Sequence, residues 1–150
     1  MEKVYFENEH VRVSYDEALQ LGMAEWQGFL NSEAFRSNGL RCLQLITEKK
    51  LTRWLADSRR MKAIRQQDQE WVLQELLPRL LDSLLQRMAN LVSEDIFNKM
   101  AFEQMIKRSN GRLGDFRIKE FEDKEAALEW LSGPVVQEAP AETGTATQEN

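Results

Sequence analysis

The sequence predicts a single α/β domain built on a mixed β-sheet. Three short β-like runs come first, and strands and helices alternate after them. A hairpin that leads into such an alternation predicts a sheet that is mostly parallel beyond the hairpin, with helices packed against it. The 150 residues suffice for about one domain with one core.

The first half of the chain contains four predicted strands and one helix. The strands are short and β-like, and they cover residues 4–6, 10–15, 21–26 and 51–56. A polar turn at Asp16 and Glu17 joins the second strand to the third, which predicts an antiparallel hairpin. Asn31 and Ser32 can cap a helix over residues 33–49.

The second half predicts three more helices and two more strands. A long helix over residues 67–86 contains Pro78, which should kink it because proline lacks a backbone donor and crowds the preceding turn. A strand over 87–92, a helix from Ser93 to about Asn110, a strand over 116–121 and a helix over 124–131 follow. The predicted order is βββαβαβαβα, with about four helices.

The composition changes at Gly133 and Pro134. Residues 134–150 contain no Lys, Arg or aromatic residue and three of the 25 acidic residues. Such a segment buries too little apolar surface to offset its ordering entropy. We therefore expect a folded domain over residues 1–133 and a disordered acidic tail over 134–150.

Charge and composition exclude several classes of protein. The net charge of −5 argues against a nucleic-acid binder, which needs a basic surface to displace counterions from phosphate. No apolar run approaches the length of a transmembrane segment, and the first residues do not have the pattern of a signal peptide. A lone cysteine excludes an internal disulfide, so we expect a cytoplasmic location. This charge and composition are also compatible with a homo-oligomer.

Residues for catalysis or metal binding are scarce. His10 and Cys42 are the only histidine and cysteine, too few for an ordinary zinc site, and Cys42 is expected to be a buried, inert thiol. The sequence has no P-loop, G-x-G-x-x-G or H-E-x-x-H motif. Paired carboxylates occur where predicted helices begin, so capping explains them. We expect no catalytic residue, no metal, no cofactor and no enzyme activity.

A basic segment is the main candidate site. Residues 49–65 contain seven Lys or Arg residues and one acid. Ligands of open α/β sheets favour the crevice beyond the carboxyl ends of strands, and arginine suits the binding of anions. The candidate residues for a ligand or partner are Asp57, Arg59, Arg60, Lys62 and Arg65. The alternative is a solvated basic loop without a binding role.

Several segments resemble bacterial proteins of the STAS/SEC14-domain, SpoIIAA-like family, which is related to anti-sigma-factor antagonists. The similar segments cover about residues 4–131 and are 22–29, 32–36, 54–61, 68–71, 87–89, 95–100 and 121–131. The resemblance implies a SpoIIAA-like fold. The antagonists are switched by phosphorylation of a Ser or Thr where their second helix starts. Here residues 62–68 hold no hydroxyl and no glycine, and Ser58 falls earlier, at the strand end, so no phosphorylation is expected.

These observations leave two functions of different classes. The preferred prediction is a noncatalytic regulatory or interaction module that binds a protein partner or a small anionic ligand at residues 57–65. The alternative is a SEC14-like carrier of a small amphipath or lipid, with a Met- and Leu-lined cleft between the second and third helices. A deep apolar pocket with convergent polar groups would favour the carrier.

Overall fold

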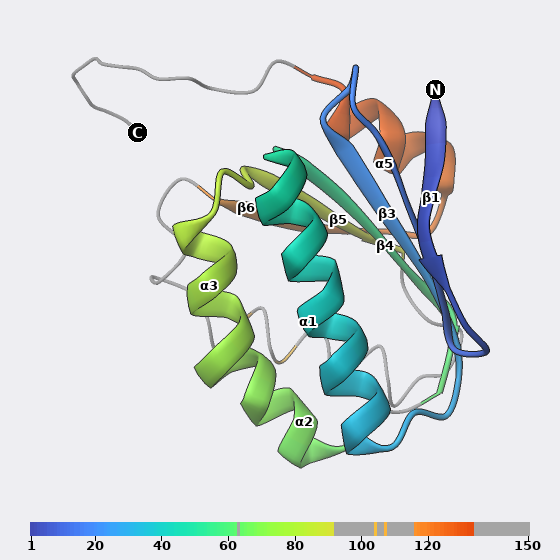
Figure 1. The fold of residues 1–150 in the computed structure, drawn as a ribbon, viewed down its shortest axis with the longest axis vertical. Coiled ribbons are helices and arrows are strands. Elements are labelled where there is room, and N and C mark those ends of the chain that lie inside the picture. Colours follow the sequence, from blue (N-terminus) through green and yellow to red (C-terminus); the bar gives the residue numbers. More distant parts are fainter. Residues whose placement is uncertain (63, 92–103, 105–106, 108–115, 134–150) are drawn as a thin grey trace.

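The computed structural model describes residues 1–62, 64–91, 104, 107 and 116–133. Over these residues six strands form one sheet in the order β1-β2-β3-β4-β5-β6 (Figure 1). The strands are β1 (Glu2–Glu7), β2 (Val11–Asp16), β3 (Leu21–Gly28), β4 (Arg53–Met61), β5 (Arg87–Leu91) and β6 (Arg117–Phe121). Pairing is antiparallel from β1 to β3 and parallel from β3 to β6. The prediction of a mixed, mostly parallel sheet that begins with an antiparallel hairpin is confirmed.

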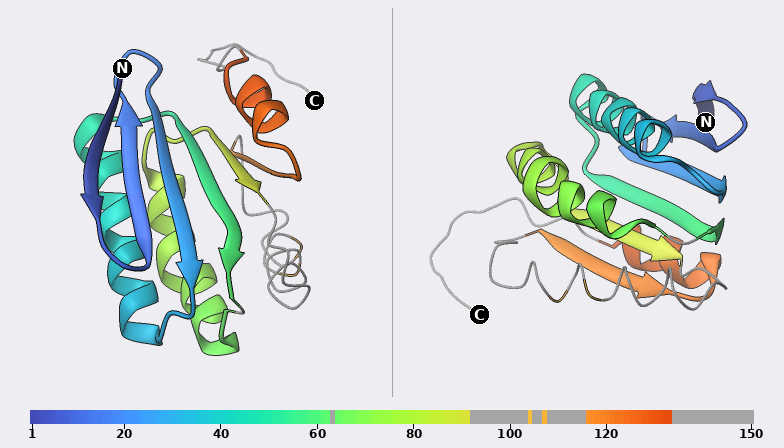
Figure 2. Two further views of the ribbon diagram at one scale, coloured as in Figure 1. Left: turned by 90° about the vertical axis from the view of Figure 1, so that its right-hand side faces the viewer. Right: turned by 90° about the horizontal axis from the view of Figure 1, so that it is seen from below.

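Helices cover both faces of the sheet. They are α1 (Ser32–Lys49), the consecutive segments α2 (Gln66–Trp71), η1 (Val72–Leu76) and α3 (Leu77–Asp82), and α5 (Lys124–Leu131). Figure 2 shows α5 on the opposite side of the sheet from α1 and α3. The helix expected from Ser93 to Asn110 and the expected tail fall largely or wholly outside the described residues. None of the described helices is long and apolar enough to cross a membrane.

The strands bury apolar side chains on both faces because side chains alternate along a strand. Trp54 and Ala56 of β4 pack in the larger core, under α1 and α3. Leu55 lies between them in sequence and packs in a smaller core, against α5. Gly22 of β3 pairs with Trp54. A Cβ at position 22 would overlap the Trp54 ring, so this close approach requires glycine.

Strand β4 is longer than the sequence indicated. The prediction ended the strand at Ala56, whereas the structure continues it to Met61. The charged residues look like a loop in the sequence, but β3 extends to Gly28 and pairs with β4 up to Met61. The register shifts between Glu25 and Gln27, which is a β-bulge. Residues 57–60 therefore have the fixed side-chain directions of a strand.

The long second helix is interrupted and ends earlier than predicted. The π-helical segment η1 precedes Pro78, and the Leu77 N–H bonds to the carbonyl of Val72. A π-turn accommodates a proline that would otherwise crowd the carbonyl four residues back. The prediction ran the helix to residue 86, but the helical segment α3 ends at Asp82. Ser83 takes an extended conformation, and its hydroxyl donates to the Leu80 carbonyl.

Candidate functional site

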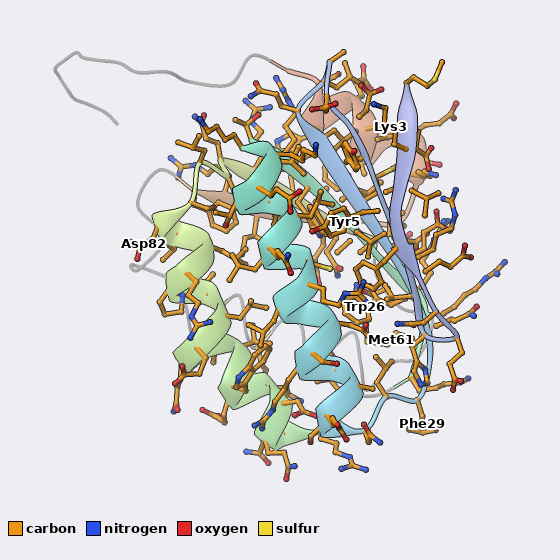
Figure 3. All side chains as sticks on the ribbon, in the orientation of Figure 1. Lys3, Tyr5, Trp26, Phe29, Met61 and Asp82 are labelled. Carbon is orange, nitrogen blue, oxygen red and sulfur yellow. The ribbon has the colours of Figure 1, made fainter. Side chains whose placement is uncertain are left out.

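An apolar cavity lies between the sheet and the layer formed by α1 and the α2–η1–α3 segment. Its volume is about 140 Å³. Cys42 and Ile46 line it from α1, Leu73 and Leu77 from the second helical segment, and Met88 from the sheet. None of the described residues that line it is charged. In Figure 3, Trp26 and Met61, which also line it, lie on the sheet side of α1.

Small residues in the walls provide the space. Ala56 and Ser58 follow Trp54 on the helix-covered face of β4, and Gly39 lies on α1. A Cβ at Gly39 would make ordinary contacts, 3.5 Å from the Trp71 ring. The cavity therefore has small side chains on two opposite walls, among larger apolar residues.

Two polar side chains meet in this apolar wall. Ser58 of β4 and Asn90 of the neighbouring strand β5 are 9% and 2% exposed. The Ser58 hydroxyl donates to Oδ1 of Asn90 over 3.0 Å. Ala56 is the backbone neighbour of Asn90 in the parallel register, which places the Asn90 side chain on the cavity face. Sequence reasoning missed this pair, although a polar residue within the otherwise apolar run 88–91 was a usable signal.

Cys42 is buried in the cavity wall, as expected for an inert thiol. Burial raises the pKa of its thiol to about 12, because the thiolate would lose its hydration. The thiol is therefore protonated at neutral pH, in the state that is a poor nucleophile.

A buried carboxylate joins the beginnings of the two helices that cover the cavity. Asp68 of α2 is 1% exposed and accepts hydrogen bonds from the Ser32 hydroxyl (3.1 Å) and from Nε of Arg36 (3.0 Å) on α1. The Arg36 guanidinium also lies over the Trp71 ring, 5.7 Å from its centroid. These contacts hold α2 against α1 at one end of the cavity. The four residues belong to the segments 32–36 and 68–71, which resemble the SpoIIAA-like family, and in this structure they connect the two helices.

The basic segment is divided between the two faces and the end of the sheet. Asp57 and Arg59 lie on the face opposite the cavity, and the Arg59 guanidinium donates to both Asp57 carboxylate oxygens over 2.9 and 2.8 Å. Burial raises the pKa of Asp57, hydrogen bonds from Arg59 lower it, and the net result is a pKa below the usual range. Arg60 is exposed, beside the same groove.

That groove carries both signs of charge. Its volume is about 380 Å³. It is lined by three acidic residues, Glu7, Glu25 and Asp57, and by three basic residues, Arg12, Arg59 and Arg60. Three carboxylates oppose three guanidinium groups, so the groove is not a basic surface. Its balance of charges suits an anion less well than the sequence suggested.

Lys62 and Arg65 lie apart from the groove. Lys62 directly follows β4, where its backbone N–H donates to the Gly28 carbonyl over 3.0 Å. Arg65 precedes α2 and borders a separate hollow with Phe29 and Asn31. The structure therefore brings together Asp57, Arg59 and Arg60, and it places the other two candidates elsewhere.

The described part of the chain offers neither a metal site nor a test of the cleft expected between the second and third helices. No group of three or more His, Cys, Asp or Glu residues there could hold a metal ion. The cleft expected between the second and third helices involves a helix that falls largely outside the described residues. The cavity found among the described residues lies under the first and second helices.

Comparison with known proteins identifies the fold. The chain matches a crystal structure of an uncharacterised protein from the DUF3478 family with a SpoIIAA-like fold, from Shewanella loihica PV-4. The TM-score is 0.52 at 16% sequence identity, over 87% of this chain and 92% of that one. The fold is SpoIIAA-like. No protein-family model matches the sequence, and no curated protein matches it.

The SpoIIAA-like fold confirms the resemblance seen in the sequence. The structure also shows where Ser58 lies. This hydroxyl was expected at the end of the strand. It lies instead within β4, buried, with its side chain in the cavity wall. A modifying enzyme would have to open the core to reach it.

Proposed function

We propose that this chain is a noncatalytic regulatory module of the cytoplasm that binds a small, largely apolar molecule in the cavity. The observation that carries the proposal is a cavity of about 140 Å³ whose described lining residues carry no charge and include the polar pair of Ser58 and Asn90. Ligand sites are typically apolar with a few placed polar groups. Apolar cavities of about 150 Å³ bind molecules of the size of benzene.

The side chains of the cavity support binding without turnover. The Ser58 hydroxyl donates to the Asn90 amide oxygen, and an amide is too weak a base to activate a nucleophile. The Cys42 thiol is protonated, because burial raises its pKa to about 12. Neither group has the arrangement of an activated nucleophile.

A benzene titration of the full chain tests the proposal. We expect saturable NMR shifts at cavity methyl groups such as those of Ile46 and Leu73, because benzene replaces empty space with dispersion contacts. Ala56→Leu extends a side chain into the cavity and should weaken benzene binding by about tenfold or more.

Ala34→Leu is the matched control, since Ala34 lies on α1 but does not line the cavity. It should leave benzene binding unchanged. Shifts confined to the protein surface, or equal binding by the Ala56→Leu variant and the parent, would contradict the proposal.

Binding of an acidic partner at the sheet groove is a second candidate function. The specific observation in its favour is Arg60, which is exposed and for which the structure records no ion pair among the described residues. A guanidinium of this kind is available for a carboxylate of a partner.

An oligoglutamate peptide tests this second function. Arg60→Gln should weaken peptide binding several-fold at low salt and less at high salt, where charges are screened. Lys3→Gln removes an equal charge from an exposed position on β1 and is the control. Equal losses in the two variants would show that net charge, rather than the groove, attracts the peptide.

A further inference from the structure

We infer that the molecule bound in the cavity is neutral and carries one hydrogen-bond acceptor, such as a carbonyl oxygen, which the Asn90 amide nitrogen recognises. This inference rests on the proposed function, because it names the class of ligand that the same cavity takes. It follows from the hydrogen bonding of Asn90, the lack of charge among the described residues that line the cavity, and the cavity volume.

The Asn90 side-chain amide has N–H groups for which the structure records no acceptor among the described residues. Its Oδ1 accepts from Ser58, which leaves the two N–H bonds of Nδ2 for other partners. No acceptor for Nδ2 is recorded among the residues that the structure describes, and the residue is 98% buried in the cavity wall. Because the residue lines the apolar cavity, a ligand acceptor placed beside Nδ2 would form its hydrogen bond with little competition from polar side chains.

Ser58 acts as a positioning residue for this donor. The two ends of an amide differ, and the Ser58 hydroxyl bonds to the oxygen end. The nitrogen end is thereby left to face a ligand. The Ser58 hydroxyl also keeps free lone pairs, so it can accept from a ligand hydroxyl as a second contact.

The cavity walls select against ionised ligands. The described residues that line it carry no charge, so a carboxylate or ammonium would lose its hydration without a counter-ion. The volume of about 140 Å³ suits a single ring with a short substituent. The expected ligand class is therefore a small neutral ketone, aldehyde, ester or alcohol with an apolar body.

Three probes of nearly equal shape test this selection on the full chain. They are acetophenone, which carries a carbonyl, α-methylstyrene, in which a methylene replaces the carbonyl oxygen, and benzoate, which is ionised at neutral pH. The parent should bind acetophenone and α-methylstyrene, and it should not bind benzoate measurably. Asn90→Leu should lower the preference for acetophenone over α-methylstyrene by about tenfold, because it removes the donor and keeps the volume.

A second measurement uses the parent alone, in case Asn90→Leu does not fold. The side-chain amide protons of Asn90 should move downfield in the NMR spectrum with acetophenone and not with α-methylstyrene. If both probes bind but this signal does not respond to acetophenone, or if Asn90→Leu leaves the preference unchanged, the inference is wrong and the proposed function stands. If neither probe binds the parent, the proposed function itself fails.

Discussion

Ser58→Asp is expected to destabilise the domain by about 3–5 kcal/mol, because it places a carboxylate in a cavity wall where the described residues carry no charge. The substitution also removes the hydroxyl that donates to Asn90. Thermal and urea unfolding of the full chain measure the loss. The introduced carboxyl should be harder to ionise in the folded state than in the unfolded state. The deficit relative to the parent should therefore shrink as the pH falls, since protonation removes the buried charge.

Two variants separate the charge from the lost hydrogen bond. Ser58→Ala removes the hydroxyl alone and should cost about 1–2 kcal/mol, the price of an unpaired buried amide oxygen. Ser37→Asp makes the same change at an exposed position of α1 and should stay within about 0.5 kcal/mol of the parent. Equal stability of Ser58→Asp and the parent would show that the side chain reaches solvent and would reopen the question of a phosphorylation switch.

Arg53→Met should also be strongly destabilising, by about 2–4 kcal/mol. The Arg53 guanidinium donates to the carbonyls of Leu131 and Gly133 where α5 ends, and to the carbonyl of Leu19 near β3. A cation there also complements the negative end of the helix dipole. Burial and the neighbouring Arg87 lower the pKa of Arg53, the direction expected for a guanidinium that has lost part of its hydration. Methionine keeps the apolar stem and leaves three carbonyl oxygens without this donor.

Arg60→Met is the matched control for Arg53→Met. It makes the same substitution on the same strand, at an exposed side chain. We expect a change within about 0.5 kcal/mol in urea unfolding. If both variants lost similar free energy of unfolding, the loss would come from removing an arginine of β4 in general. The contacts of Arg53 with the end of α5 would then not explain it.

The order of strands and helices could be predicted from the sequence because each element has a local signal. The alternation in residues 10–15 and the turn at Asp16 predict the antiparallel start, and Asn31 does cap α1, with its side chain accepting from the Ala34 N–H. The last helix occurs over residues 124–131 as expected. The boundaries of β4 and of the second helix were wrong, because they depend on pairing with β3 and on the local bonds of Ser83.

The candidate site shows most clearly what the sequence determined and what the tertiary structure decided. The sequence determined that the charges of residues 57–65 lie near the carboxyl end of a central strand. Strand alternation, in a strand that continues past Ala56, decided that Ser58 faces the cavity while Asp57 and Arg59 face the opposite side. The cavity itself depends on Gly39, Ala56 and Asn90 meeting across three elements. No local pattern encodes such a meeting, because the space between packed layers is set by the sum of the side-chain volumes that face it.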